Sequence, residues 1–350
     1  MNEADSPATS WLQPQPLETA STLPAHCYVD AAFAARERAA VFARSWQLVA
    51  FSAQVSEPGD HVIADIAGVP LLVVRGDDGA LRALHNVCRH RAGPLATCDG
   101  RARTLTCKYH GWTYALDGRL LGAPDMGRAR DFDVAAYALP RVPLAEWGGL
   151  VFAALTGDGV PFERLVDGVE PPPALVFERR AVYELACNWK VYVENYLEGY
   201  HVRQVHPALS ALLDADAYET RVGSLWVLQT SPLARTDELY GPGFARYVWL
   251  WPNTMLNVLP GRLQTNRVLP IDAQRCRVVF DYYYSAHAAA EFRAADMDFS
   301  DAVQREDIAI CEAVQRGLAS GSYASGRLNP HQEQGIWRFQ ELLRAAYRSG

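Results

Sequence analysis

The sequence lacks any apolar run long enough to span a membrane. Its longest apolar stretches, such as AGVPLLVV at residues 67–74, fall far short of the roughly 20 residues that a membrane helix needs. Residues 1–16 have neither the basic start nor the apolar centre of a secretory signal peptide. These two absences predict a cytoplasmic protein with no membrane partner.

The chain also lacks a basic field and a cysteine pattern suited to disulfides. Its 33 Lys and Arg against 40 Asp and Glu give a net charge of -7, which does not indicate a nucleic-acid partner. Seven cysteines are an odd number in a chain without a secretory signal, so most are expected to be reduced thiols. A hydrophobic content of 49% over 350 residues is typical of a globular protein with about two domains.

The apolar spacing divides the chain into three parts. Residues 1–44 form an N-terminal segment, helical over 30–46, that we expect to pack on the second domain. Over 45–155, short apolar runs separated by Gly, Pro and Asp predict a small antiparallel β domain. After a Pro- and Gly-rich join, residues 156–350 mix strand-like runs with helical patterns after 190, over 297–318 and over 332–347. This mixture predicts an α+β domain with helices against an antiparallel sheet.

Two Cys/His pairs lie in the β domain, Cys88 with His90 and Cys107 with His110, sixteen residues apart. Structural zinc takes two Cys and two His, but zinc sites usually pair Cys with Cys and His with His. A two-iron cluster in which one iron keeps two thiolates and the other takes two imidazoles fits one Cys and one His from each of two loops. Cys98 matches neither half of the pattern. The spacing favours the cluster and leaves zinc as the alternative.

A second group of possible metal ligands lies in NWKVYVENYLEGYHVRQVHPAL, residues 188–209. On a helix Glu198 and His201, three apart, share a face. His206 is five beyond His201, so the helix must distort or end between them for both imidazoles to reach one metal, and Pro207 favours an ending. Two His and one carboxylate form the facial triad of non-haem Fe(II) oxygenases, which leaves positions open for O2 and substrate. The alternative is two unrelated surface histidines.

The third ligand is expected downstream, where DFSDAVQREDIAICEAVQRGL offers Asp298, Asp301, Glu306 and Asp307. On a helix, Asp307 interrupts an apolar stripe whose other members are Val303, Ile310, Cys311, Val314 and Leu318. A charge on a buried face is costly unless it is paired or bound to metal. This spacing favours Asp307.

These motifs together resemble the Rieske non-haem iron oxygenases, the ring-hydroxylating oxygenase alpha-subunit family. The resemblance rests on C-x-H, sixteen residues and C-x-x-H before Gly-Trp, and on N-W-K, E-N-Y and the Glu198, His201 and His206 spacing, and it covers the chain from about Trp46 to the last helix. It implies an all-β Rieske domain followed by a catalytic domain of helix-grip, START-like fold. Cys88, His90, Cys107 and His110 would bind a [2Fe-2S] cluster, and His201, His206 and Asp307 a mononuclear Fe(II).

The same resemblance implies how electrons reach the iron. Glu198 stands where the family usually has Asp, and it would link a cluster-binding His of a neighbouring subunit to His201. A homotrimer is therefore expected. O2 would be the co-substrate, and a separate reductase or ferredoxin would deliver electrons from NAD(P)H, because the 350 residues show no flavin or nucleotide domain.

Within this family, ENYLEGYHVRQVHPAL and WPNTMLNVLP look most like the choline monooxygenase branch, which hydroxylates or N-demethylates quaternary ammonium compounds. Aromatic faces bind such cations. Candidate cage residues are Tyr196, Tyr200, Trp226, Tyr247, Trp249 and Trp251. A substrate carboxylate could be held by Arg203, Arg246, Arg262 or Arg267. The alternative substrate is an aromatic acid or ether, and the alternative functions are a Rieske electron carrier and a zinc-stabilised binding module.

Overall fold

The structure is a computed structural model that describes residues 10–157, 159–233 and 239–349. Its contacts divide the chain into two compact units: Phe42–Phe162 forms one, and Met1–Val41 with Glu163–Gly350 forms the other. Each unit has its own sheets and its own hydrophobic core. The domain limits expected from the sequence, 1–44, 45–155 and 156–350, stay predictions.

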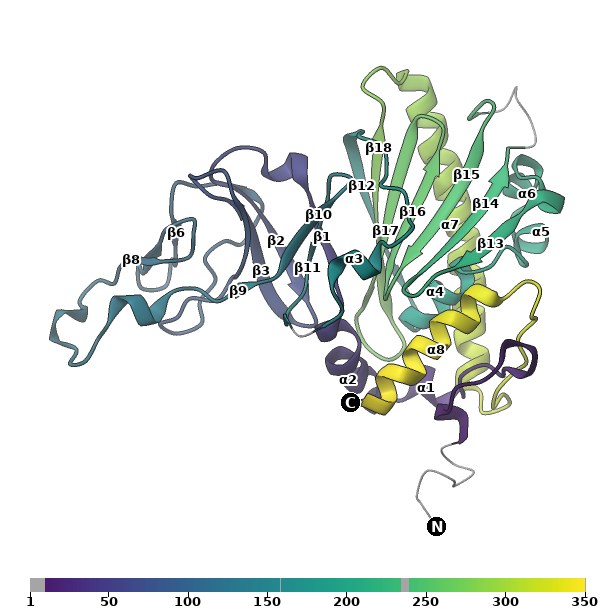
Figure 1. Cartoon of the computed structure of the whole chain (residues 1–350), viewed down its shortest axis with the longest axis horizontal. Coiled ribbons are helices and arrows are strands. Elements are labelled where there is room, and N and C mark those ends of the chain that lie inside the picture. Colours follow the sequence, from purple (N-terminus) through teal and green to yellow (C-terminus); the bar gives the residue numbers. More distant parts are fainter. Residues whose placement is uncertain (1–9, 158, 234–238, 350) are drawn as a thin grey trace, which may run out of the picture. The chain divides into compact units, whose positions relative to one another are not determined.

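The unit Phe42–Phe162 is built from short antiparallel strands (Figure 1). A five-stranded sheet has the order β5-β2-β3-β4-β9, and two three-stranded sheets have the orders β1-β11-β10 and β6-β7-β8. The strands are β1 (Gln47–Phe51), β2 (Asp60–Ile66), β3 (Val69–Arg75), β4 (Leu81–His85), β5 (Gly100–Arg101), β6 (Leu105–Thr106), β7 (Thr113–Tyr114), β8 (Leu120–Gly122), β9 (Arg141–Val142), β10 (Leu144–Trp147) and β11 (Leu150–Ala153). The expected all-β domain is confirmed.

Strand β3 lies between two hydrophobic cores. Successive side chains of a strand point to opposite faces, so Leu71 and Val73 join one core while Leu72 and Val74 join the other. The second core also contains Cys88, Cys107 and Trp112. The side chains of the two cysteines are therefore part of the packed interior of the unit.

The other unit is centred on a seven-stranded antiparallel sheet of order β12-β18-β17-β16-β15-β14-β13. Its strands are β12 (Val176–Leu185), β13 (Glu219–Val222), β14 (Trp226–Pro232), β15 (Phe244–Leu250), β16 (Thr254–Leu259), β17 (Arg262–Pro270) and β18 (Cys276–Tyr284). From β14 to β18 each strand pairs with the one before it, whereas β12 pairs with β18. The chain therefore leaves the sheet after β12 and re-enters it at the opposite edge.

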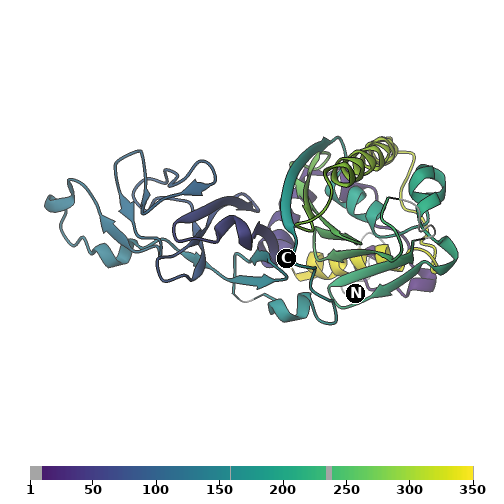
Figure 2. The ribbon, with the colours of Figure 1, turned by 90° about the horizontal axis from the view of Figure 1, so that it is seen from above.

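Helices of this unit pack on the sheet and on one another. They are α1 (His26–Val29), α2 (Ala31–Ala40), α4 (Trp189–Tyr196), α5 (Val202–Val205), α6 (Pro207–Leu212), α7 (Ala290–Ala319) and α8 (Gln334–Ser349), with a short α3 (Phe162–Leu165) where the sequence passes from one unit to the other. α7 runs along one face of the curved sheet (Figure 2), where Ser300 Oγ accepts hydrogen bonds from Gln264 Nε2 at 2.9 Å and Tyr282 Oη at 3.1 Å. This arrangement confirms the expected α+β class.

The expected helices differ from the observed ones mainly at their ends. α7 begins at Ala290, seven residues before the expected start, because the alanine-rich stretch before residue 297 favours helix. The helix expected over 30–46 is the shorter α2, which Asp30 caps by accepting a hydrogen bond from Ala32 N at 2.8 Å. No helix in the described ranges is long and apolar enough to cross a membrane.

Candidate metal centres

The two Cys/His pairs lie on two loops of the β unit that have the same backbone turn. The loop after β4 carries Cys88 and His90, and the loop between β6 and β7 carries Cys107 and His110. In each, the Cys carbonyl accepts a hydrogen bond from a residue four further on, Ala92 N at 3.0 Å and Gly111 N at 2.9 Å. The two Cys therefore have the same place in their turns, whereas the His follows its Cys by two residues in the first loop and by three in the second.

In these loops the thiols are buried and the imidazoles are exposed to solvent. Cys88 and Cys107 are 3% and 2% exposed, whereas His90 and His110 are exposed, with ring centroids 4.6 Å apart. The His90 ring stacks on buried Trp112, with centroids 4.9 Å apart. Cys98 is exposed and is not part of this group. A cluster with thiolates on an inner iron and imidazoles on an outer iron matches that division.

Two neighbouring residues fit a cluster at this place. A Cβ added at Gly93 would lie 2.9 Å from Cys107 Sγ, so the glycine leaves room beside the sulfur. The Tyr114 hydroxyl lies 3.4 Å from Cys88 Sγ, and it accepts a hydrogen bond from Arg89 N at 2.9 Å, so its proton is directed to the sulfur. Hydrogen bonds to cluster sulfurs are one of the ways a protein sets the cluster potential.

In the other unit, one atom each of His201, His206 and Asp307 comes within 4.8 Å of the others. Asp307 Oδ1 lies 3.0 Å from His206 Nε2 and 3.7 Å from His201 Nε2. These three atoms face a common point from the start of α5, the start of α6 and the middle of α7. They are the donor types of a two-His, one-carboxylate iron site.

The opposite nitrogen of each imidazole faces a glutamate. Glu198 Oε1 lies 2.5 Å from His201 Nδ1, and Glu306 Oε2 lies 2.7 Å from His206 Nδ1. Burial alone would lower the pKa of His206, but the carboxylates of Asp307 and Glu306 outweigh it and raise the pKa. A carboxylate on one nitrogen fixes the tautomer that leaves the other nitrogen free for metal.

The backbone around these histidines is less helical than the sequence spacing predicted. Glu198 and His201 lie in the turn between α4 and α5, so their contact comes from this turn and not from one helix face. A Cβ at Gly199 would meet the Tyr218 ring at 2.8 Å, so only glycine fits the turn. The expected ending before Pro207 is confirmed, because α5 stops before His206 and Pro207 starts α6.

On α7 the buried face is polar, which corrects the apolar stripe that singled out Asp307. Ile310 and Val314 are 37% and 45% exposed. Apart from Cys311, the buried residues of the helix are Asp296, Ser300, Gln304 and Gln315. The reason is that these polar groups have partners: Ser300 and Gln304 line the cavity beside the potential ligands, and Asp296 and Gln315 accept hydrogen bonds from the Tyr240 hydroxyl and Asn188 N.

The other acids weighed for the third ligand have different surroundings. Asp298 is exposed, and Asp301 accepts a hydrogen bond from Tyr183 at 2.8 Å and pairs with Arg305. Asn195 belongs to the E-N-Y motif, but the motif assigns it no role; in the structure its Nδ2 donates to Asp307 Oδ1 at 2.6 Å and so fixes this carboxylate from α4.

A cavity of about 100 Å³ adjoins the three potential ligands. Of the expected cage aromatics, Tyr196 and Tyr247 line it, and the structure adds Tyr192, Tyr218 and Phe280. The expectation was wrong for the other four. Trp249 and Trp251 pack against Phe339 of α8, with centroids 5.5 and 6.1 Å away. Trp226 is buried and donates to the Asp167 carbonyl, and Tyr200 is 57% exposed.

None of the four candidate arginines is among the described residues that line this cavity, and neither is any lysine. Arg203 lies 3.6 Å from Asp216 on the surface, and Arg246 pairs with Glu170. Arg267 lies 3.5 Å from Asp281. Arg262 is buried against Asp296 beside a neighbouring cavity.

Two family models match the two units of the chain. The model "Rieske [2Fe-2S] domain" matches residues 45–139, and "Ring hydroxylating alpha subunit (catalytic domain)" matches residues 174–349. The chain belongs to the Rieske ring-hydroxylating oxygenase alpha-subunit family. It is thus an O2-dependent oxidoreductase with a Rieske [2Fe-2S] domain and a catalytic domain of the mononuclear-iron type, which excludes the zinc-module and electron-carrier interpretations.

Within the Rieske oxygenases, the chain is similar to enzymes that act on quaternary ammonium compounds. It is 35% identical over 340 residues to the chloroplastic choline monooxygenase of Arabidopsis thaliana, covering 89% of this chain and 80% of the relative. It is 32% identical over 355 residues to the carnitine monooxygenase oxygenase subunit of Escherichia coli (strain K12), covering 95% of each. The quaternary ammonium Rieske monooxygenase CntA in complex with L-carnitine superposes with a TM-score of 0.85 at 28% identity, covering 95% of this chain and 99% of CntA.

Proposed function

We propose that this Rieske oxygenase hydroxylates or oxidatively N-demethylates a quaternary ammonium or N-methyl compound. The observation that carries this proposal is the lining of the cavity beside His201, His206 and Asp307. It combines aromatic faces with acidic side chains, and no lysine or arginine is among the described residues that line it. A cation gains from both features.

The hydroxyl groups of three cavity tyrosines donate hydrogen bonds to amide side chains. Tyr196 donates to Asn257 Oδ1 at 2.8 Å, Tyr218 to Gln229 Oε1 at 3.0 Å and Tyr192 to Gln304 Oε1 at 2.6 Å. With the hydroxyls held in this way, the ring faces keep fixed orientations, which supports a preformed cage. An aromatic acid, the alternative substrate, would need a cationic partner, so the described lining favours it less.

The proposed ligands are Cys88, His90, Cys107 and His110 for the cluster, and His201, His206 and Asp307 for the iron. When bound, the two groups supply electrons and activate O2 beside the substrate. The residues that line the cavity bind the substrate, and the residues around the imidazoles determine where the imidazole protons lie. Glu198 and Glu306 keep the protons of His201 and His206 on Nδ1, and Asn195 fixes Asp307 by its hydrogen bond.

We further propose a homotrimer in which Glu198 links the His201 imidazole to a cluster-binding His of a neighbouring subunit. Electrons would come from NAD(P)H through a separate reductase or ferredoxin. A cytoplasmic location stays a prediction. Sedimentation of the purified protein tests the trimer, since a monomer that turns over substrate would contradict transfer between subunits.

Single-turnover chemistry tests the function without the unidentified reductase. Anaerobically purified, iron-loaded protein is reduced with dithionite, freed of excess reductant and mixed with O2 and one compound. We expect formaldehyde or a hydroxylated product from methylammonium compounds and none from benzoate-type acids. The reverse pattern would overturn the substrate class.

Cysteine variants provide the matched control for this experiment. Cys107→Ser is expected to lose the cluster, its visible absorption and the turnover, because a thiolate ligand is removed. Cys98→Ser, at an exposed cysteine, is expected to keep all three.

A further inference from the structure

A hollow of about 280 Å³ lies between the N-terminal segment, α4 and α7. Among the residues that the structure describes, it shares no lining residue with the cavity beside the proposed iron ligands. Leu23, Val314 and Leu318 form apolar walls, and Glu194 is the only charged side chain in the described lining. Val314 is 45% exposed, so the hollow opens to the surface. A small molecule can therefore enter it from solution.

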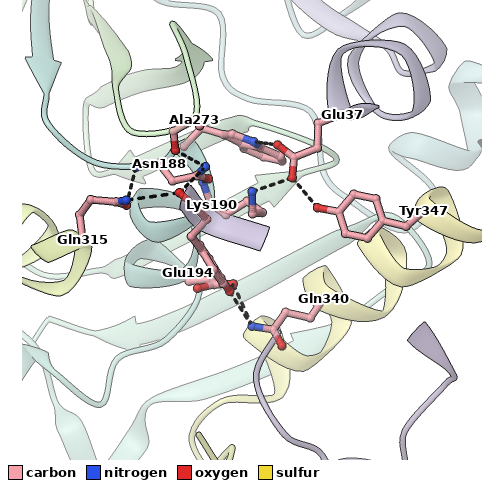
Figure 3. A network of polar contacts seen from close by, with 10 residues as sticks. Glu37, Asn188, Lys190, Glu194, Ala273, Gln315, Gln340 and Tyr347 are labelled. Atoms are coloured by element: carbon pink, nitrogen blue, oxygen red, sulfur yellow. Dashed lines mark hydrogen bonds and ion pairs between the residues drawn. The ribbon is translucent and has the colours of Figure 1, made fainter. Parts of the chain in front are cut away.

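Glu194 brings to this hollow a carboxylate with one oxygen unpartnered. Its two hydrogen-bond donors, the Tyr28 hydroxyl at 2.7 Å and Gln340 Nε2 at 2.8 Å, both donate to Oε1 (Figure 3). No donor in the described part of the chain reaches Oε2. Burial raises the pKa of this carboxyl to about 7, so the two donors do not offset the cost of burying its charge. A further donor at Oε2 would stabilise the ionised form, and a molecule in the hollow can supply it.

The charges around Glu194 leave the hollow negative. Besides burial, Glu333 raises the pKa of Glu194 and Lys190 lowers it, because their charges act on the carboxylate with opposite signs. The charge of Lys190 is already matched, since its Nζ lies 2.6 Å from Glu37 Oε1. No lysine or arginine is among the described residues of the lining. A cation that enters the hollow therefore meets a carboxylate that lacks a cationic partner.

We propose that this hollow binds a small protonated amine, whose N–H donates to Glu194 Oε2 and whose alkyl groups contact the apolar walls. The ring of Tyr323 lines the same hollow, and its hydroxyl lies 2.7 Å from Thr22 Oγ1, so an aromatic ring held in place also borders the cation. A quaternary ammonium ion has the charge but no N–H, so it binds less tightly here. This inference goes beyond the proposed function and does not depend on it, because the hollow is separate from the cavity beside the iron ligands.

The test compares trimethylammonium with tetramethylammonium, which differ in a single N–H. Binding to the iron-loaded enzyme is measured by calorimetry at pH 8, where Glu194 is mostly ionised. We expect trimethylammonium to bind more tightly by roughly tenfold or more, because it adds a hydrogen bond between charged groups. Glu194→Gln should remove most of this preference. Glu219→Gln, at an exposed glutamate of β13, is the matched control and should keep it.

Gly317→Leu tests the place of binding without altering Glu194. Gly317 lines the hollow and a Cβ added there would meet open space, so a leucine can fill the hollow. This variant should lose the preference for trimethylammonium, whereas Ala319→Leu, at an exposed position of the same helix outside the described lining, should keep it. Equal binding of the two ions by the wild type, or a preference that survives in both Glu194→Gln and Gly317→Leu, would overturn the proposal. Either result would leave the proposed function standing, since product formation tests that function separately.

Discussion

At the scale of single residues, each imidazole near the proposed iron has its own carboxylate. Glu198 holds His201 and Glu306 holds His206, both through Nδ1. The Glu306 side chain is 42% exposed while that of His206 is 2% exposed, so the glutamate acts from the surface on a buried ring. Groups of this kind orient the metal ligands without touching the metal.

Glu306→Ala is therefore expected to weaken iron binding by roughly 10- to 100-fold, because His206 loses the partner that fixes its tautomer and ring orientation. Glu306→Gln, which keeps a hydrogen-bond acceptor, should recover part of the loss. Iron retained against a graded chelator measures the effect. Glu291→Ala, at an exposed position on the same helix, is the control, and equal iron retention in all variants would refute the role of Glu306.

At the scale of elements, α4 is anchored by a buried polar network (Figure 3). Asn188 caps the helix by accepting a hydrogen bond from Lys190 N at 3.0 Å, and its Nδ2 donates to the Ala273 carbonyl at 2.7 Å. Lys190 Nζ lies 2.6 Å from Glu37 Oε1 of α2, and both side chains are buried. The N-W-K motif therefore fixes the helix that supplies Asn195 to the site.

Glu37→Ala is expected to destabilise the fold by about 3–5 kcal/mol, because it leaves a buried ammonium unpaired. Two further donors lose their acceptor, Trp189 Nε1 and the Tyr347 hydroxyl. Denaturant unfolding measures the change. Glu18→Ala, at an exposed glutamate of the same N-terminal segment, should be near neutral, and a similar loss in both variants would contradict the argument.

Glu194 makes the stability of the same region depend on pH. Burial raises its pKa to about 7, although the Tyr28 hydroxyl and Gln340 Nε2 donate hydrogen bonds to its carboxylate. The unfolded chain loses this proton near pH 4.5 and the folded chain only near 7. This group's contribution to stability therefore falls as the pH rises through that window.

Glu194→Gln should remove the loss of stability that the ionisation of Glu194 causes as the pH rises. Relative to wild type, we expect the variant to gain about 1–3 kcal/mol in the free energy of unfolding at pH 8 and little at pH 4. Unfolding at both pH values measures the difference, with Glu219→Gln as an exposed control. A gain that is the same at the two pH values would show that Glu194 does not titrate in this range.

The potential metal ligands could be predicted from the sequence, whereas the partners of those ligands and part of the cavity lining could not, for a physical reason. The ligand candidates follow from fixed spacings, C-x-H, C-x-x-H and the Glu198, His201 and His206 series, which short loops preserve. Adjacent acids such as Glu306 and Asp307 have the same local pattern, so their different partners depend on the tertiary fold. Tyr218 and Phe280 come from separate parts of the chain that meet only in the folded sheet.

At the scale of the whole molecule, the two sets of potential ligands lie in different compact units with different cores. His201→Ala is therefore expected to abolish product formation while leaving the cluster spectrum and its reduction by dithionite unchanged. Iron should fall from about three to about two per chain, with sulfide constant at about two. Loss of sulfide in this variant would show that the units do not hold their groups independently.

The polar face of α7 also determines how the range of substrates could be altered. Ser300 and Gln304, which line the cavity, lie about 10.5 and 4.5 Å from Asp307 along the helix axis, at about 1.5 Å per residue. Each of the two positions therefore faces the cavity at its own distance from the potential ligands, while the helix keeps the spacing constant. A library confined to these two positions would vary the length and polarity of the accepted molecule stepwise and leave the ligand set in place.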